Sequence, residues 1–447
     1  MTTVTSEQPA ATRGKLWDPD AETMPRSELV SMQNEKLQRQ LRYIYRNSRF
    51  FQDLWDAAGV HPRRIESIDE LHKLPTFSKD DLRTYREKSG DPFAGTCCVP
   101  ADQLTLVAHS TGTSGKPNLY GLTAEEYEEV GKIYARSSYT IGLRPGYHLI
   151  MIGGIRWHGA VLGWDKAFEQ MGVVKYYFGN GTHDIVKEVI DHGDDLRDLD
   201  AVMVYQPEAE LQYLRSAGVD PKKTFPNLKM LWSAVDASPA RRKILVDTWG
   251  VPFKNQYGSG DQFWMTGECP HDCRDHHAPE DYFLFEALDP TTNEPVPAGQ
   301  TGVLHVTNLW ATSFPYIRYN MEDMVTCSTA PCACGRTSMR LRVHGRLAWS
   351  VRIGDRYVFT QEVENVLWEQ PGMAGANYQL VRQSPQPQHR LIVRVVPNAD
   401  ATSPALLREQ LEEALTREFG VPSDVVFVDP GDITTKGVKM QRIRDDS

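Results

Sequence analysis

Residues 109–120, HSTGTSGKPNLY, carry the strongest chemical signature in the chain. The apolar run 103–110 predicts a strand, and the residues after it are dense in glycines and hydroxyl groups. Glycines let backbone N–H groups approach phosphate oxygens, hydroxyls add donors, and Lys116 adds a positive charge. The segment lacks the glycine at 110 and the serine or threonine at 117 that a Walker A loop needs. The pattern predicts a phosphate-binding loop, with an ordinary polar turn as the alternative.

Five of the seven cysteines lie in the segments GECPHDCRDHH (267–277) and CSTAPCACGR (327–336). Disulfides are disfavoured because the sequence shows no secretion signal, whereas thiolates and imidazoles are the ligands of structural zinc. A tight turn could present Cys332 and Cys334 together, and cysteines without a metal are the alternative. The opposite ligands would be Cys269 or Cys273, with His276 or His277.

Strands alternate with helices through the first half of the sequence, which predicts a parallel α/β sheet. Ser78 and Thr123 each precede a helical pattern and are predicted N-caps. The apolar runs that predict strands lie at 103–110, 148–154, 173–178, 200–206, 228–235 and 252–258. Further helices are predicted at 27–58, 159–172 and 239–250.

After Tyr282 the pattern changes to strands separated by turn-rich stretches, which predicts a β-rich lobe. From about residue 348, shorter strands and helices predict an α+β domain of about 100 residues. The fold class is therefore predicted as α/β. A large N-terminal domain with parallel or mixed sheets and a β-rich lobe would precede a small, mobile α+β C-terminal domain.

The composition of the 447 residues limits the class of protein. Forty per cent apolar residues suffice for large cores and exclude a disordered chain. Lys and Arg number 49 against 59 Asp and Glu, and the net charge of −10 argues against nucleic-acid and membrane partners, including a zinc-finger module. The sequence has no apolar run of about 18 residues and no signal-like start, so a soluble, cytoplasmic protein is expected.

The loop 110–117 resembles the phosphate loop of the adenylate-forming superfamily, which includes acyl-coenzyme A synthetases and adenylation domains. Both loops have two hydroxyl residues, glycine, two more hydroxyl residues, glycine, a basic residue and proline. Other segments resemble the superfamily in the right order: KNQYGSGDQF (254–263), FPYIRYNMEDMV (314–325), the hinge-like 344–367 and the lysine loop TTKGVKMQR (434–442). Within it, phenylacetate–coenzyme A ligases are most similar, through FSKDDLR (77–83), GEC (267–269), the acidic stretch 277–304 and CACGR (332–336).

The resemblance implies that a substrate carboxylate attacks the α-phosphorus of ATP, and that the acyl group of the resulting adenylate passes to an acceptor. The implied catalytic residues are Lys439 at the α-phosphate, Lys79 near the phosphates, and Asp261 in place of a Mg²⁺-binding glutamate. Aspartate is one methylene shorter, so a water-bridged Mg²⁺ contact is an alternative. The implied ATP-binding residues are Ser110, Thr111, Gly112, Thr113, Ser114, Gly115, Lys116, Asp236, Tyr257, Gly258, Asp323 and Arg346, with Tyr257 under the adenine and Asp323 on the ribose.

The acid pocket that the resemblance places beside this site favours a small aromatic acid, with Arg156 or His158 near a ring substituent. Its predicted walls are Trp157, His158, Tyr205, Ser233, Ala234, Ser259 and Gly260. The subgroup has zinc-bound members, and the resemblance implies a structural zinc in a lobe spanning about 267–336. Its implied ligands are Cys269, His277, Cys332 and Cys334.

The domain boundary is predicted at the hinge, with a large domain over 1–346 and a small domain carrying Lys439 over 347–447. The superfamily's hinge normally has two acidic residues, which Leu347, Ala348, Trp349 and Ser350 replace here. Coenzyme A is the first predicted acceptor. An aryl-acid ligase of secondary metabolism that uses an amine, hydroxyl or carrier thiol is the alternative. A further alternative is a nucleotide-binding pseudoenzyme. Analogy with the subgroup suggests a homodimer.

Overall fold

The computed structural model describes residues 15–109, 117–152, 158–178, 185–193, 195–204, 207–235, 238–272, 274–398, 403–433, 435–436, 439–440 and 442–446. Its helices are α1 (Pro19–Glu22), α2 (Arg26–Asn47), α3 (Arg49–Ala57), α4 (Lys79–Ser89), α5 (Ala124–Ile141), α6 (Gly159–Met171), α7 (Ile185–Asp191), α8 (Pro207–Ala217), α9 (Pro221–Thr224), α10 (Pro239–Trp249), α11 (Thr360–Trp368) and α12 (Pro404–Phe419). Short 3₁₀ helices are η1 (Pro62–Arg64), η2 (Ile68–Lys73), η3 (Ala101–Gln103), η4 (Leu347–Trp349) and η5 (Pro430–Asp432). No helix of these described residues is long and apolar enough to span a membrane.

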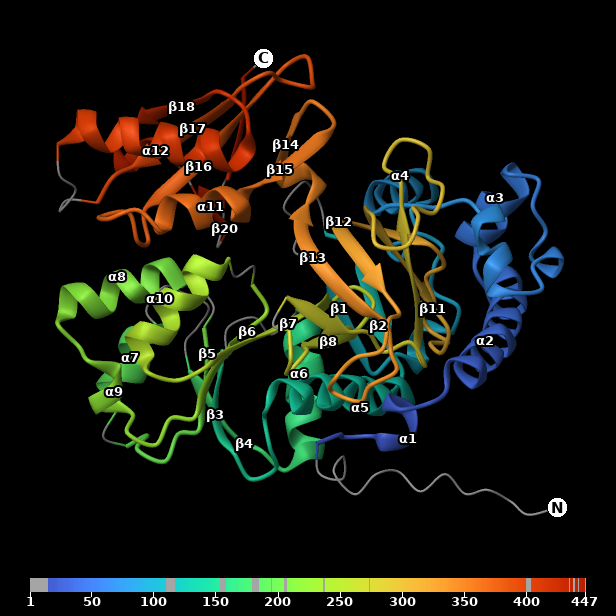
Figure 1. Ribbon diagram of the computed structural model, residues 1–447. Coiled ribbons are helices and arrows are strands. Elements are labelled where there is room, and N and C mark those ends of the chain that lie inside the picture. Colours follow the sequence, from blue (N-terminus) through green and yellow to red (C-terminus); the bar gives the residue numbers. More distant parts are fainter. Residues whose placement is uncertain are drawn as a thin grey trace.

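A mixed sheet forms the centre of the large domain (Figure 1). Over the described ranges it has eleven strands in the order β10-β11-β12-β13-β9-β8-β7-β6-β5-β3-β4. Their bounds are β3 (His148–Ile152), β4 (Val174–Phe178), β5 (Ala201–Met203), β6 (Met230–Ser233), β7 (Phe253–Ser259), β8 (Trp264–Glu268), β9 (Asp275–His277), β10 (Phe283–Leu288), β11 (Thr301–Asn308), β12 (Tyr319–Ser328) and β13 (Arg340–Arg346). The separate ribbon β1 (Leu106–His109) and β2 (Leu119–Leu122) is antiparallel.

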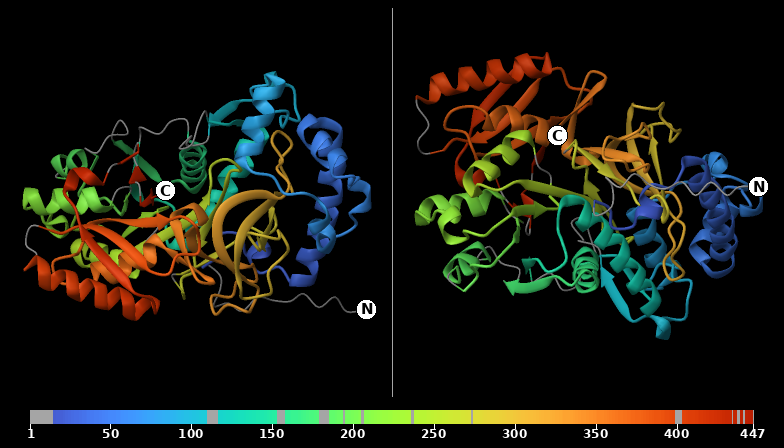
Figure 2. Two further views of the ribbon diagram at one scale, coloured as in Figure 1. Left: turned by 90° about the horizontal axis from the view of Figure 1, so that it is seen from above. Right: turned by 60° about the horizontal axis from the view of Figure 1, so that its bottom comes forward.

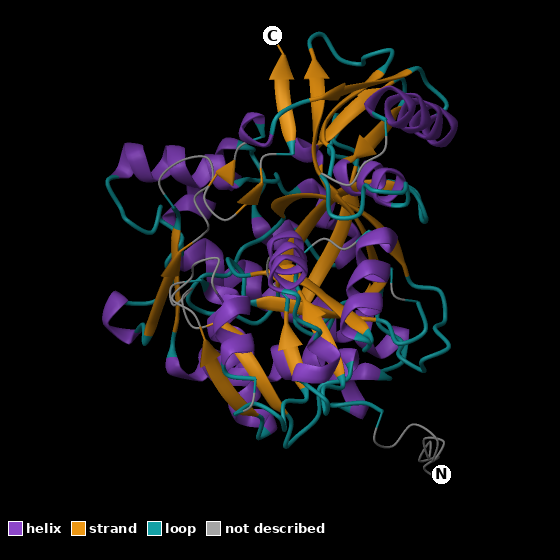
Figure 3. Ribbon diagram, turned by 90° about the vertical axis from the view of Figure 1, so that its left-hand side faces the viewer, coloured by secondary structure: helices purple, strands orange, loops and turns teal. Residues whose placement is uncertain are grey.

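The strands from β3 to β7 pair in parallel, as the alternating sequence pattern predicted. Helices cover both faces of this half (Figure 3), so its strands are apolar on both sides. Leu149 and Met151 join the core beneath α5 and α6, whereas Ile150 joins the core beneath α8 and α10. This alternation explains why the strands are continuous apolar runs in the sequence.

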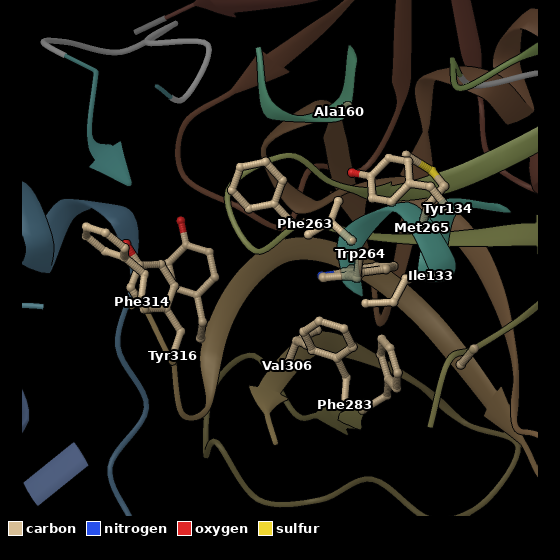
Figure 4. Close-up of a cluster of buried hydrophobic side chains, with 14 of the residues drawn as sticks. Ile133, Tyr134, Ala160, Phe263, Trp264, Met265, Phe283, Val306, Phe314 and Tyr316 are labelled. Atoms are coloured by element: carbon tan, nitrogen blue, oxygen red, sulfur yellow. The ribbon is translucent and has the colours of Figure 1, made fainter. Parts of the chain in front are cut away.

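The predicted β-rich lobe is continuous with the parallel half, because β8 pairs antiparallel with β7. It begins at Trp264, earlier than the pattern change after Tyr282 suggested. Figure 4 shows Phe263, Trp264 and Met265 in the cluster of buried side chains, together with Tyr134 of α5 and Phe283 of β10. This aromatic core therefore joins the two halves of the sheet.

Local signals at the helix starts are confirmed. Ser78 and Thr123 are N-caps of α4 and α5, and each forms a capping box with the third helical residue. The segment predicted at 27–58 forms α2 and α3, which lie at the edge of the large domain away from the α/β half (Figure 2).

The residues after β13 form a smaller unit with its own core, which lies above α8 and α10 in Figure 1. Its described strands include a four-stranded sheet in the order β18-β17-β16-β21, packed against α11 and α12. The bounds of the strands are β14 (Ser350–Ile353), β15 (Arg356–Phe359), β16 (Asn377–Gln383), β17 (Leu391–Val396), β18 (Ser423–Phe427), β19 (Thr435–Lys436), β20 (Lys439–Met440) and β21 (Ile443–Asp446).

Phe77 joins α4 to the sheet and provides a test of this packing. It is 2% exposed, and its ring lies 5.3 Å from Phe51, 5.5 Å from Tyr316 and 5.2 Å from Tyr319. Phe77→Ala removes these contacts and leaves a cavity, so the free energy of unfolding should fall by about 3–5 kcal/mol. Urea unfolding followed by fluorescence measures the change. Val426→Ala, at an exposed position, is the control, and an equal midpoint for both variants would contradict the prediction.

Candidate active site and metal centre

The carboxyl ends of β3, β5, β6 and β7 lie at one edge of the sheet, because these strands are parallel and adjacent. Several predicted pocket segments follow these strand ends, whereas the predicted phosphate loop follows β1 of the separate ribbon. The predicted residues that lie outside the described residues are Ser110, Thr111, Gly112, Thr113, Ser114, Gly115, Lys116, Arg156, Trp157, Tyr205, Asp236 and Cys273. The candidate site is therefore built from the described residues that surround them.

The residues that flank the phosphate loop and the predicted acid pocket lie together. His109, at the end of β1, forms a parallel bridge with His158, the residue before α6. A Cβ atom on Gly159 would lie 2.4 Å from the carbonyl oxygen of Gly260, and a Cβ on Gly260 would lie 3.2 Å from Cε1 of His158. Glycine is needed here because the start of α6 directly contacts the backbone after β7.

A hydrogen bond joins the predicted adenine and ribose residues. The Tyr257 hydroxyl on β7 donates to Oδ2 of Asp323 on β12 at 2.7 Å. Nε of Arg346, which faces Asp323 across β12 and β13, lies 3.4 Å from Oδ1 of the same carboxylate. The structure thus brings together three residues that the sequence placed in the ATP site.

The remaining predicted wall residues differ in what they offer a ligand. Ser233 is fully buried, and its hydroxyl donates to the carbonyl of Val204 at 2.6 Å, so it anchors the segment that follows β6. Ser259 is 6% exposed, whereas Ala234 is exposed. A Cβ atom on Gly258 would lie 2.2 Å from the carbonyl oxygen of Trp264, so this position accepts no side chain.

Lys79 has a partner that sequence reasoning missed. Its Nζ atom lies 2.5 Å from Oε2 of Glu322, the residue before Asp323. Glu322 has a φ of +62°, which is unfavourable for a residue with a side chain. The backbone carbonyl of Lys79 accepts a hydrogen bond from Nδ2 of Asn118, just after the phosphate loop. Lys79 therefore lies between Asn118 and the segment that carries Asp323. In the sequence, only the position of Glu322 inside the R-Y-x-x-x-D segment indicated this pair.

Asp261 lies partly buried in the turn after β7, among tyrosine side chains. The Tyr319 hydroxyl lies 3.4 Å from its Oδ2 atom. Burial raises the pKa of the Asp261 carboxyl, while the positive charges of Arg346 and Lys79 act in the opposite direction. A carboxylate that is destabilised in this way would be stabilised by a bound cation, so its environment suits the predicted Mg²⁺ contact.

Lys439 lies in β20, which pairs with β19 in a register that places Lys436 opposite Lys439. The side chain of Lys439 lies outside the part of the chain that the structure describes. In Figure 1, β20 lies on the side of the small domain that faces the large domain. The predicted catalytic role of Lys439 stays a prediction.

Four predicted metal ligands converge between the segments 267–277 and 327–336. One ligand atom each from Cys269, His277, Cys332 and Cys334 lies within 4.8 Å of all the others. Nδ1 of His277 lies 3.1 Å from the hydroxyl oxygen of Ser338, to which it can donate its proton. The other ring nitrogen, Nε2, is then unprotonated and lies 3.2 Å from Sγ of Cys334, where it can act as a metal ligand. A hydrogen bond from Cys334 lowers the pKa of Cys269, which favours a thiolate.

Strand geometry separates the two candidate histidines. Successive side chains of a strand point to opposite faces, so His277 faces the cysteines while His276 faces the ring of Tyr257, 6.2 Å away. Cys327 lies outside the group, and burial raises its pKa to about 12. The structure thus assembles the ligand set that the resemblance implied, as far as the described residues extend.

Comparisons with known proteins agree with this architecture. Residues 356–447 match the sequence profile of the family described as AMP-binding enzyme C-terminal domain. A phenylacetate–coenzyme A ligase of Thermus thermophilus is 29% identical to this chain over 462 aligned residues, which cover 96% of this chain and 99% of the relative. These matches support the adenylate-forming superfamily. Within this superfamily of ATP-dependent ligases the chain is similar to phenylacetate–coenzyme A ligases, as the sequence predicted.

Solved structures of acyl-coenzyme A ligases share the fold of this chain. The crystal structure of 2-hydroxyisobutyryl-CoA ligase in the postadenylation state superposes with a TM-score of 0.86 at 22% identity, covering 100% of this chain and 95% of the other. The same ligase in the thioesterification state gives a TM-score of 0.70 at 22% identity and equal coverage. The domain arrangement described here is therefore nearer to the first state.

The raised pKa of Asp261 predicts a stability effect with a defined dependence on pH. Below its ordinary pKa the carboxyl is neutral in both the folded and the unfolded protein, so burial carries no penalty. As pH rises through the folded-state pKa, stability is lost. Asp261→Asn should therefore raise the unfolding temperature of the ligand-free protein at pH 7, and the gain should shrink toward pH 4. Scanning calorimetry measures it, and a gain that grows on acidification would contradict the assignment.

Proposed function

We propose that this superfamily member activates a small aromatic carboxylic acid as its acyl-adenylate and transfers the acyl group to coenzyme A. The predicted sequence of ATP-dependent activation and coenzyme A transfer agrees with the comparisons. The observation that carries the proposal is the hydrogen-bonded set of Tyr257, Asp323 and Arg346, with Lys79 held beside it by Glu322. These groups can orient a nucleotide and neutralise its phosphates.

In the first step, a carboxylate oxygen of the acid bonds to the α-phosphorus of ATP as the bond to pyrophosphate breaks. This in-line displacement needs alignment and charge neutralisation. Asp323 would accept hydrogen bonds from the ribose, while Lys79 and Lys439 would bring positive charge to the phosphates. Mg²⁺, which Asp261 would hold directly or through water, would neutralise phosphate oxygens. In the second step, the thiolate of coenzyme A attacks the acyl carbon and AMP leaves.

The aromatic class of the acid is supported by the side chains around the contact of α6 with β7. His158 borders Gly260, and the rings of Tyr120 and Phe263 pack nearby, edge to face at 5.4 Å. A Cβ on Gly159 would lie 3.0 Å from both the Tyr120 hydroxyl oxygen and Cε1 of Phe263, which places these rings at the start of α6. An aromatic acid would suit this environment, because aromatic edges favour aromatic faces.

The second proposal is that the four-residue cluster binds one structural zinc ion. Three sulfurs and one imidazole nitrogen suit tetrahedral zinc, and Cys269, His277 and Cys334 are each less than 10% exposed. The turn at Cys332 also supplies Arg336, whose buried guanidinium pairs with Glu22 of α1 at 2.5 Å. The metal would therefore stabilise the lobe and the packing of the N-terminal helix, away from the reacting atoms.

We also propose the predicted domain boundary at 346/347.

Pyrophosphate exchange tests the first step. With a suitable member of a panel of small aromatic acids, the chain should exchange labelled pyrophosphate into ATP, and Lys439→Ala should slow this by about 10²–10³-fold. Lys436→Ala, in the same hairpin, is the matched control and should retain exchange. If none of the acids supports exchange, the proposal is excluded.

Product analysis with and without coenzyme A identifies the acceptor. A product formed without coenzyme A would favour the alternative ligase that uses another acceptor, which the altered hinge suggests.

Metal analysis tests the second proposal. The purified chain should contain about one zinc per molecule. Cys332→Ser should lose it and unfold at a lower temperature, because binding free energy contributes to folding. Cys327→Ser, outside the cluster, should retain the metal. Equal zinc contents in the two variants would reject the ligand set.

A further inference from the structure

The first turn of α10 is one of the places where the large domain contacts α11 of the small domain. This turn follows β6 and the predicted adenine segment 233–237, and it starts at the N-cap Ser238. The backbone N–H of Ala240 donates to Oδ1 of Asn365 at 2.9 Å. A helix start leaves its first N–H groups without partners inside the helix, and here a residue of the other domain accepts from one of them.

Glu364 lies at the centre of this contact and is 2% exposed. Its Oε1 atom accepts hydrogen bonds from the Ser238 hydroxyl at 2.7 Å and from Nε of Arg241 at 2.9 Å, and Nη2 of Arg241 donates to Oε2. The Arg241 guanidinium also lies 5.1 Å from the centre of the Trp368 ring. A carboxylate of the small domain is therefore bound bidentately by an arginine of the large domain, with both groups shielded from water.

Glu364 also lies near the strand that carries Lys439. Nη2 of Arg442, two residues after β20, lies 3.9 Å from Oε2 of Glu364, and the Tyr378 hydroxyl donates to the same oxygen at 3.4 Å. Nη1 of Arg442 donates to the carbonyl of Tyr378 at 3.3 Å, which ties this arginine to β16. Glu364 thus contacts the helix that follows the adenine segment and lies beside the segment that follows the lysine hairpin.

We propose that Glu364 is a positioning residue for acyl-adenylate formation, because it holds the start of α10 and the segment that follows the strand of Lys439 in one arrangement. The inference rests on the proposed function. A buried ion pair inside a core leaves an unpaired charge when it breaks, which is strongly destabilising. Glu364 and Arg241 lie between two domains, so separation exposes both charges to water. The pair therefore favours the closed arrangement reversibly, without being required for the folding of either domain.

The comparison structures support a role in one step rather than in both. This chain superposes on the postadenylation state of 2-hydroxyisobutyryl-CoA ligase better than on its thioesterification state, with TM-scores of 0.86 and 0.70. The contacts of Glu364 belong to the arrangement nearer the first state. Weakening them should slow adenylate formation and leave the transfer step largely unchanged.

The test compares Glu364→Gln and Arg241→Gln with the control Asp247→Asn. Glu364→Gln keeps the shape of the side chain but removes its charge. Asp247 is an exposed carboxylate on α10 that pairs with Lys243, and such surface pairs contribute little. Pyrophosphate exchange measures the first step, and thioester formation from preformed acyl-adenylate measures the second. Small-angle X-ray scattering of the full chain measures the separation of the domains, and calorimetry measures stability.

Glu364→Gln and Arg241→Gln should each slow exchange by about tenfold or more and enlarge the radius of gyration. Transfer rates and unfolding temperatures should stay near those of the control, and the double variant should be no slower than either single one.

Equal slowing of both steps with a lower unfolding temperature would indicate a purely structural role and overturn the inference. Unchanged scattering and exchange would also overturn it. If the unaltered chain shows no exchange with any acid, the proposed function fails, and the scattering comparison still decides whether Glu364 holds the domains together.

Discussion

The 2.7 Å hydrogen bond from Tyr257 to Asp323 is the contact on which the candidate site depends. Tyr257 lies on the last parallel strand, whereas Asp323 lies on a strand of the antiparallel half. These halves form one sheet because β8 pairs with β7 and β9 pairs with both β8 and β13. The proposed nucleotide-binding residues of both halves therefore meet only if this strand order is kept. The aromatic core around Trp264 stabilises that order, since its ring packs against Tyr257 at 5.4 Å and against Phe285 at 5.3 Å.

The cysteine cluster contacts the same strands through His277 of β9, which pairs with β8 and β13. His277 faces the three cysteines and its neighbour His276 faces Tyr257, so the strand β9 lies between the cluster and the proposed nucleotide site. The loop that carries Cys332 and Cys334 leads to Arg336, which pairs with Glu22 near the start of the described chain. A metal here would fix β9 and the N-terminal helix together. Its effect on the ligase reaction would then come through the geometry of Tyr257.

The sequence was informative where the signal is local. Helix caps such as Ser78 and Thr123 and the apolar runs of the parallel strands depend on residues within one turn or one strand, and they were predicted correctly. Motif order placed Tyr257, Asp323 and Arg346 in one site. Contacts between distant segments were not predictable in this way. Lys79 and Glu322 are 243 positions apart, and Glu364 meets Arg241 across a domain contact. Nor did the pattern reveal that the β-rich lobe continues the parallel sheet, because one strand pairing carries that information.

The candidate site combines several arrangements that oppose stability. Burial disfavours the charged form of Asp261, and Glu322 adopts a backbone conformation that is unfavourable for its residue type. A bound cation would stabilise the charged form of Asp261, whereas the carboxylate of Glu322 already pairs with Lys79. The surrounding structure tolerates them because large aromatic side chains, fully buried on both sides of the β7–β8 turn, hold the backbone in place. Both unfavourable residues therefore lie in the candidate site, where Asp261 suits a cation and Glu322 fixes the position of Lys79.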